Sequence, residues 1–322
     1  MIDYTYFYNC DCVQGAKNYL RDNSIDLLIC DPPYGINGNE LDKHYKRNEN
    51  TVLDGYIEVS TEEYANFSHN WIKEAERVLK PGGSFYIISG YTNLRHILNA
   101  LSETKLKEVN HIIWKYNFGV YTKQKFVSSH YHILYYIKPG GKKTFNTYAF
   151  YDDNEKTPTG GSLNYLDRED VWVINREYKP NQIKNKNELP ESLLKKIILY
   201  SSNPNDMVCD FFLGSFSTAR VATKLGRNSC GFELNQVSFE HYLNKLKEIS
   251  YGCEMPQEKN NNGAPNNRGK RISDAERKSI IASFNEKIQH GISKKQAINF
   301  VAAEFSRGYW SIIRIIERAN TI

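Results

Sequence analysis

The chain has 322 residues, of which 40% are hydrophobic and 25% charged, and its formal net charge is +5. This composition is ordinary for a globular protein, and the length exceeds a single domain of roughly 100–200 residues. We therefore expect a main domain with a smaller appendage. No apolar run approaches the roughly 20 residues of a membrane helix, and the first residues lack the features of a signal peptide. We expect a cytoplasmic protein with no membrane partner.

The positive charge is concentrated near the end of the chain. Residues 256–322 contain 12 Lys and Arg against 6 Asp and Glu, whereas residues 1–255 contain 30 against 31. Because phosphates attract basic segments whatever the base sequence, the last part is the better candidate for contact with nucleic acid. The six cysteines include no Cys-x-x-Cys pair, so we predict no metal site. Cys30 and Cys209 end apolar runs, and we expect buried thiols there.

Predicted strands and helices alternate along the first 250 residues. The expected strands are 4–8, 25–30, 84–89, 111–115, 130–137, 207–210 and 229–233, and the expected helices are 13–21, 61–79, 93–102, 189–201, 215–225 and 236–250. This alternation predicts a mostly parallel sheet covered by helices on both faces. No helix fits between 111–115 and 130–137, so we expect an antiparallel hairpin there.

Two stretches interrupt this pattern. Residues 138–188 are polar and weakly periodic, and a stretch this long without strong elements is usually functional or disordered. Residues 256–271 have the composition of a linker. We therefore predict a main domain over 1–255 and a helical domain over 272–322.

The predicted helical domain contains three helices. A capping box, from Ser273 to Glu276, opens the first, and Ser293 caps the second, 294–305. A short turn with glycine joins it to the third, 309–319. Two helices joined in this way are typical of a helix-turn-helix unit that binds DNA, with a small bundle for dimerisation as the alternative.

Asp31, Pro32, Pro33 and Tyr34 directly follow the predicted strand 25–30. Open α/β sheets bind ligands at the carboxyl ends of their strands. The prolines remove two donors, which leaves acceptors: the Asp31 carboxylate and nearby carbonyls. An exocyclic amino group has two N–H donors to satisfy, and Tyr34 offers a face on which a base can stack. The pattern favours a pocket for an amino group, with a plain turn capped by Asp31 as the alternative.

A second set of residues suits a nucleotide-like cofactor. Residues 207–218 predict a strand, a tight turn of small residues and a helix start, where the backbone can approach a ligand. Glu233 ends the following strand, a position from which an acidic side chain can bind ribose hydroxyls. The spacing from Asp210 to Glu233, with a helix between them, strengthens this interpretation.

In this order, the motifs resemble the β group of amino-methyltransferases acting on DNA, in which Asp-Pro-Pro-Tyr precedes the loop for S-adenosylmethionine. The resemblance covers residues 4–250 and includes further motifs at 9–12, 79–83, 130–134 and 189–194. It implies a Rossmann-like methyltransferase fold. We therefore expect an α/β structure with a mostly parallel seven-stranded sheet, an antiparallel hairpin and a small all-α C-terminal domain.

The resemblance also implies roles for matching positions. Asp31 would accept a hydrogen bond from the target amino group, Pro33 would offer its carbonyl and Tyr34 would stack, so Asp31, Pro32, Pro33 and Tyr34 are the predicted catalytic residues. Asp11 would meet the adenine amino group of S-adenosylmethionine, and Glu233 would bind its ribose. The predicted cofactor-binding residues are Asp11, Cys12, Asp31, Asp210, Phe211, Phe212, Gly214, Ser215, Glu233 and Leu234.

The implied activity is site-specific transfer of a methyl group from S-adenosylmethionine to the amino group of a flipped adenine. Asp, rather than Ser, at the first position of the element favours adenine over cytosine. A cytosine-N4 DNA methyltransferase and one for RNA or a protein amide are alternatives. Implied partners are duplex DNA with an adenine-containing site, a second copy in a homodimer and a cognate restriction endonuclease.

Two positions depart from the family pattern Asp-Pro-Phe-x-Gly-Ser-Gly. Phe211 stands in place of the proline and Phe216 in place of the last glycine. The Phe216 ring would crowd the loop if it pointed at the cofactor, so we expect it to point into the core. The departures weaken the expected cofactor affinity and leave open a DNA-binding regulator with an inactive methyltransferase domain.

Basic residues in three segments are candidates for DNA contact. Residues 138–188 are the predicted target-recognition insert, and the loop 35–56 is predicted to close over the flipped base. The third segment is the helix-turn-helix-like unit. The candidates are Lys43, Lys46, Arg47, Lys142, Lys143, Arg168, Arg307 and Arg314, with Arg176 as a further one.

Overall fold

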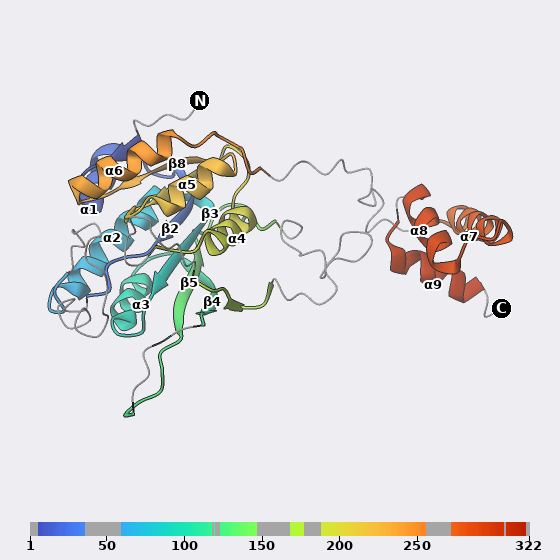
Figure 1. Ribbon diagram of the computed structural model, residues 1–322, viewed down its shortest axis with the longest axis horizontal. Helices are drawn as coiled ribbons and strands as arrows, with labels where there is room; N and C mark the ends of the chain where they lie inside the picture. Colours follow the sequence, from blue (N-terminus) through green and yellow to red (C-terminus); the bar gives the residue numbers. More distant parts are fainter. Residues whose placement is uncertain are drawn as a thin grey trace. The chain divides into compact units, whose positions relative to one another are not determined.

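The computed structural model describes residues 6–35, 59–117, 119, 123–146, 168–176, 188–255, 272–305 and 307–319. The chain divides into two compact units, Met1–Ala149 with Glu169–Met255 and Phe150–Arg168 with Pro256–Ile322. Figure 1 shows a sheet with helices in the first unit and a group of helices in the second. Among the described residues, no helix combines the length and hydropathy that crossing a membrane requires.

The first unit is built on one sheet, in the order β1-β8-β7-β2-β3-β5-β4-β6. Neighbouring strands from β1 to β3 are parallel, β5 is antiparallel to both β3 and β4, and β6 is parallel to β4. The expected parallel sheet and hairpin are therefore confirmed. The strands are β1 Phe7–Tyr8, β2 Ile25–Cys30, β3 Leu79–Ser89, β4 Lys107–Lys115, β5 His130–Ile137, β6 Val171–Val173, β7 Met207–Asp210 and β8 Asn228–Phe232.

The described sheet has eight strands where the sequence predicts seven. The additional strand, β6, lies in the polar stretch and is only three residues long, Val-Trp-Val, with its tryptophan buried. Three residues are too short for an alternating pattern to stand out in a polar sequence. Pairing with β4 decides their conformation.

Helices cover both faces of the sheet, as expected. Phe85 and Ile87 of β3 belong to the core beneath α1 and α2, whereas Tyr86 between them bonds Ser201 of α4. Because successive side chains of a strand point to opposite faces, α4 lies on the other face. The helices of this unit are α1 Cys12–Tyr19, α2 Tyr64–Val78, α3 Leu94–Ser102, α4 Glu191–Ser201, α5 Ser217–Lys224 and α6 Gln236–Lys247.

The acidic residues predicted for the site lie together at one edge of the sheet. Asp31, Asp210 and Glu233 lie at the carboxyl ends of β2, β7 and β8, which are parallel and therefore end at the same edge. Since β5 runs the other way, its first residue, His130, lies at this carboxyl edge and its last, Ile137, at the opposite one. Cys30 and Cys209, at the same strand ends, are buried, as predicted.

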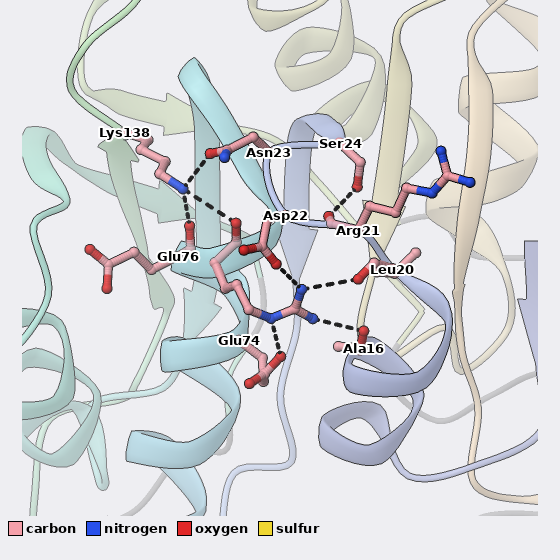
Figure 2. A network of polar contacts seen from close by, with 10 residues as sticks. Ala16, Leu20, Arg21, Asp22, Asn23, Ser24, Glu74, Glu76 and Lys138 are labelled. Carbon is pink, nitrogen blue, oxygen red and sulfur yellow. Dashed lines mark hydrogen bonds and ion pairs between the residues drawn. The ribbon is translucent and has the colours of Figure 1, made fainter.

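A polar network ties the helices together at the opposite edge (Figure 2). The Arg77 guanidinium on α2 bonds Glu74 at 2.7 Å and Asp22 at 2.6 Å, and it also donates to two carbonyls near the end of α1. Lys138, directly after β5, donates to Asn23 at 2.8 Å and to carbonyls near the end of α2. These contacts join the start of β2 to the exit of β5, away from the carboxyl edge.

The described residues of the second unit form three helices around a separate apolar core, α7 Asp274–Gln289, α8 Lys294–Glu304 and α9 Tyr309–Ala319. The predicted caps form, because the Oγ atoms of Ser273 and Ser293 accept from the amides of Glu276 and Gln296. The core residues are Ile280, Phe284, Ala297, Ile298, Val301, Ala302, Ile312, Ile315 and Ile316.

Candidate active site

A cavity opens at the carboxyl edge of the sheet, between the ends of β2, β7 and β8 and the start of α1. All ten residues predicted to bind the cofactor line it, together with Pro33 and Tyr34. Parallel pairing brings together residues that are far apart in the sequence, because each follows a strand that ends at this edge. The predicted cofactor residues therefore share one cavity with part of the Asp-Pro-Pro-Tyr element.

The loop from β7 to α5 is held by two carboxylates. Asp210 Oδ1 accepts from the Phe212 amide at 2.9 Å, and Glu233 Oε2 accepts from the Gly214 amide at 2.7 Å. Gly214 has a φ of +51°, a conformation that glycine adopts without steric cost. Burial raises the pKa of Asp210 to about 6 and raises that of Glu233. The loop thus places two acidic groups in the wall of the cavity.

The two phenylalanines that depart from the family pattern are both buried. Phe216 has a φ of +58°, and its ring centroid lies 5.5 Å from that of Phe7, in the cluster of β1, α5 and α6. The Phe211 ring contacts Phe232 at 5.5 Å. The expectation that Phe216 points into the core is confirmed. The backbone of residue 216 keeps a left-handed conformation that favours glycine, although its side chain is a large one.

Asp11 has a structural contact beside its predicted cofactor role. Its Oδ1 accepts from the amides of Val13 and Gln14, both at 3.0 Å, and so caps α1. Asp11 also lines the cavity. A carboxylate fixed at a helix N-terminus has a defined orientation, since the helix start holds it in place.

The Asp-Pro-Pro-Tyr backbone is held by two side chains that the sequence reasoning missed. The Tyr64 hydroxyl donates to the Pro33 carbonyl at 2.8 Å, and Asn93 Nδ2 donates to the Tyr34 carbonyl at 2.7 Å. Within the element, the Tyr34 hydroxyl donates to Asp31 Oδ1 at 2.7 Å. Asn93 begins α3, where a cap is expected, yet its side chain makes no capping bond to that helix. The only available signal was an Asn at a helix start, which predicts a cap instead.

Comparison with known proteins shows which family the chain matches. Residues 25–248, most of the chain, match the DNA methylase family of N6 and N4 methylases.

The chain belongs to the DNA methylase family.

The type II methyltransferase M.BamHI of Bacillus amyloliquefaciens is 33% identical over 279 residues, which cover 79% of this chain and 60% of that protein. The DNA adenine methyltransferase YhdJ of Escherichia coli (strain K12) is 32% identical over 244 residues, covering 71% of this chain and 78% of YhdJ. TTHA0409 of Thermus thermophilus, solved with S-adenosylmethionine, shares the fold with a TM-score of 0.52 at 19% identity, over 74% of this chain and 91% of that one. The predicted family and fold class are confirmed.

In this DNA methylase, the Asp31 carboxyl titrates near neutrality. Burial raises its pKa to about 7; the hydrogen bond from Tyr34 lowers it, the charge of Asp210 raises it and the Arg176 guanidinium lowers it. The negative charge of Asp210 therefore disfavours ionisation of Asp31. A buried carboxyl group with a raised pKa in a cavity is a candidate functional group.

An aromatic cluster joins Asp-Pro-Pro-Tyr to the segment after β6. The Tyr34 ring stacks on Tyr131 of β5 with centroids 5.6 Å apart. Arg176 donates to the Tyr131 hydroxyl at 3.0 Å, and its guanidinium lies 5.9 Å from the centroid of Trp114 and 5.5 Å from that of Tyr116. The sequence suggested Arg176 for DNA contact, whereas the structure places it against the rings beside the Asp-Pro-Pro-Tyr element.

The structure separates the DNA-binding candidates of the first unit. Lys43, Lys46 and Arg47 lie outside the described residues. Lys142 and Lys143 follow β5 and therefore lie at the edge opposite the cavity, where Lys143 Nζ contacts the Phe145 ring at 5.3 Å to the centroid. We withdraw these two lysines as contacts to the DNA at the active site, because the antiparallel direction of β5 carries them away from it.

The remaining candidates differ in exposure. Arg168 and Arg314 are exposed. Arg307 is buried, and its guanidinium bonds the Glu276 carboxylate at 2.8 and 2.7 Å, joining the turn before α9 to the start of α7. We therefore also withdraw Arg307 as a DNA contact. Arg314, on the outer face of α9, stays a candidate.

Proposed function

We propose that this DNA methylase transfers a methyl group from S-adenosylmethionine to the exocyclic N6 amino group of an adenine flipped out of duplex DNA. The observation that carries the proposal is the Asp31 carboxylate beside the Pro33 carbonyl, in the wall of the cavity that Asp210 and Glu233 also line. The amino group has two hydrogens, and these two acceptors suit them. The Pro33 carbonyl already accepts from Tyr64, but a carbonyl oxygen has a second lone pair.

The walls of the cavity fit the chemistry of S-adenosylmethionine. Asp11, Asp210 and Glu233 supply acceptors for amino and hydroxyl donors, and Phe67 and Phe212 supply apolar surface. When bound, S-adenosylmethionine supplies a methyl group on a positively charged sulfonium. An apolar wall favours transfer because that charge disappears as the methyl leaves. We propose on these grounds that the cavity holds the methyl donor.

Asp31 acts mainly by orientation in this proposal. The lone pair of an adenine amino nitrogen is delocalised into the ring, so the nitrogen is a weak nucleophile. Hydrogen bonds from the amino group to Asp31 and the Pro33 carbonyl direct that lone pair at the methyl. S-adenosylmethionine would supply the methyl group and leave as the thioether S-adenosylhomocysteine, and Asp31 or water would accept the proton that the amino nitrogen loses. Positioning of this kind is worth up to roughly 7–11 kcal/mol.

Two observations favour adenine as the target base. An aspartate at the first position of the element favours adenine, and YhdJ, a relative, is named an adenine methyltransferase. Duplex DNA without modified bases, incubated with the enzyme and S-adenosylmethionine, should acquire N6-methyladenine at one sequence, which sequencing of modified bases would reveal. N4-methylcytosine in its place would overturn the choice of base, and methylation of RNA but not DNA would overturn the substrate.

The role of Asp31 has its own test. Asp31→Ala should abolish methylation but leave binding of S-adenosylmethionine, measured by calorimetry, within about threefold of the unchanged protein, because Asp31 is only one of many groups in the wall. Methylation retained in this variant would remove Asp31 from the mechanism. Absence of cofactor binding by the unchanged protein would instead favour a DNA-binding regulator with an inactive domain.

The second unit is proposed to strengthen binding to DNA. Trp310, Arg314 and Arg318 are exposed on α9, whereas the opposite side of this helix is buried in the core. A helix with an exposed basic face suits the major groove. The cognate restriction endonuclease, the homodimer and the cytoplasmic location stay predictions from the sequence.

A further inference from the structure

The connection between β4 and β5 emerges beside the catalytic element. Lys115 of β4 pairs with His130 of β5 at the last rung of the hairpin. This end of the hairpin lies at the carboxyl edge of the sheet, because Ser89, the last residue of β3, pairs with His132. Figure 1 shows the connection extending beyond the strands. The hairpin therefore projects from the edge at which the flipped base would enter.

The base of this projection is ordered by contacts. The Tyr116 amide donates to the Ser129 carbonyl at 3.0 Å, one step beyond the last rung. A side chain at Gly119 would collide with Val127, so the two arms lie close together further out. Tyr131, at the foot of the second arm, stacks on Tyr34. The hairpin is thus continuous with the wall of the catalytic site.

Phe126 lies in this projecting connection and has an unusually exposed side chain. Its side chain is 98% exposed, the most exposed large apolar side chain in the described part of the chain. Lys123 and Lys125, beside it in the sequence, are also exposed. Single exposed apolar side chains are common on protein surfaces. A fully exposed phenylalanine directly after two exposed lysines, next to the cavity proposed to receive a base from a duplex, is a more specific arrangement.

Flipping a base leaves an empty space in the DNA. The neighbouring bases lose their stacking partner, and proteins that distort DNA often insert an apolar side chain at such a step. An aromatic ring suits the space because it can stack on the bases at either side. Lysines near the ring can contact the phosphates of the same strands.

We propose that Phe126 enters the base stack at the position left by the flipped base, with Lys123 and Lys125 on the adjoining phosphates. This proposal rests on the proposed function, since it concerns how the target base reaches Asp31. It assigns the β4–β5 connection, rather than Lys142 and Lys143, to the DNA at the active site.

Activity on paired and unpaired targets tests the proposal. The substrates are a duplex with the sequence that the enzyme modifies and the same strand without its complement. Phe126→Ala should lower kcat/KM on the duplex about tenfold or more, which is the size of one lost stacking contact. On the single strand the loss should stay within threefold, because no stack has to be opened. Phe126→Trp should retain activity on both.

A matched control distinguishes position from general loss of an aromatic ring. Phe145 is 42% exposed and contacts Lys143, but it lies at the opposite edge. Phe145→Ala should therefore leave kcat/KM on the duplex within twofold. Thermal unfolding of each variant checks that the fold is kept. Equal losses on duplex and single strand for Phe126→Ala, or no loss on the duplex, would overturn the proposal.

A binding measurement decides the same question without methylation. The probes are a fluorescein-labelled duplex with one abasic site and the intact duplex, compared by anisotropy. The unchanged protein should bind the abasic duplex at least threefold more tightly, because the space is already open, and Phe126→Ala should lose this preference. A preference that persists in the variant, or its absence in the unchanged protein, contradicts the proposal. Absence of any methylation, by contrast, would refute only the proposed function.

Discussion

Near neutral pH, the cavity residues Asp31 and Asp210 differ in the fraction of each carboxyl group that is ionised. Burial raises the pKa of Asp31 to about 7 and that of Asp210 to about 6, and Asp210 adds to the shift of Asp31 by repulsion. A carboxyl group whose pKa is raised in the folded protein binds protons there more readily than in the unfolded chain. Its contribution to stability is therefore present at low pH and is lost as the pH rises through the folded value. Ionisation of the buried Asp31 carboxyl therefore lowers the stability of the folded protein.

This titration predicts the pH dependence of methylation. Asp31 accepts a hydrogen bond best as the carboxylate, which predominates above its pKa of about 7. The kcat/KM of the enzyme, which reflects groups in the free protein, should be half-maximal near this pH and fall toward acid. Initial rates at low substrate concentration across the neutral range would measure it. A flat profile would show that ionisation of Asp31 is not required.

Arg176 should influence this profile although it lies outside the catalytic element. Its positive charge lowers the pKa of Asp31, and its guanidinium packs on rings next to Tyr34. Arg176→Gln should therefore move the acid limb of kcat/KM to higher pH, with a severalfold loss near neutrality that recovers in more alkaline buffer.

Arg176→Lys is the control, because it keeps the charge but loses the planar stacking. Its acid limb should stay close to that of the unchanged protein. A uniform loss at every pH in Arg176→Gln would indicate a structural role alone.

At the scale of elements, strand direction decides what the active site contains. The β4–β5 hairpin brings Tyr131 to the stack on Tyr34, and β6, paired with β4, is followed by Arg176.

The loop between β7 and α5 contains two features of Phe216 that affect stability in opposite directions. The left-handed backbone conformation of Phe216 lowers the stability of the fold by about 1–3 kcal/mol for a residue with a side chain. Its large ring is buried, which stabilises the fold.

Replacement of Phe216 measures this balance. Removing a buried phenylalanine side chain costs about 3–5 kcal/mol, more than the backbone strain that glycine relieves. Phe216→Gly should therefore lower the free energy of unfolding in urea by about 2 kcal/mol. Phe216→Ala, which keeps the strain and loses the ring, should lower it further. A more stable Phe216→Gly variant would show that the backbone strain outweighs the packing.

At the scale of the whole molecule, the chain consists of two units with separate apolar cores. The core beneath α1 and α2 and the core of α7, α8 and α9 share no residues among those described. Residues 256–322 also have an excess of basic residues. The first unit should therefore fold and bind the methyl donor without the second.

A chain ending at Met255 tests this division. Its affinity for S-adenosylmethionine should be within twofold of the full chain, whereas its affinity for duplex DNA should fall about tenfold or more, with a weaker dependence on salt because fewer phosphates are neutralised. Calorimetry and fluorescence anisotropy at two salt concentrations would measure both. Unchanged DNA affinity and salt dependence would exclude the second unit from DNA binding.

Local signals in the sequence account for the elements and for much of the site. Apolar runs, the caps at Ser273 and Ser293, and the Asp-Pro-Pro-Tyr element each depend on residues close together in the chain, and the structure contains all of them. The ten predicted cofactor residues, which the family resemblance implies, line one cavity for a related reason. Each ends or follows a predicted strand, or lies at or just before the start of a predicted helix, and parallel strands end at a common edge. No comparable local pattern predicted the contacts of Tyr64, Asn93 or Arg176, whose partners are distant in the sequence.

The sequence by itself determined the alternation of strands and helices, the order of the motifs and the identity of the acidic groups, because these depend on short-range periodicity and residue chemistry. Only the tertiary structure decided which basic and aromatic residues lie beside these acidic groups. The antiparallel direction of β5 sends Lys142 and Lys143 to the far edge and leaves Phe126 at the near one, and the Glu276 carboxylate engages Arg307. A charge is visible in a sequence, but the surface on which it lies depends on strand pairing between distant segments.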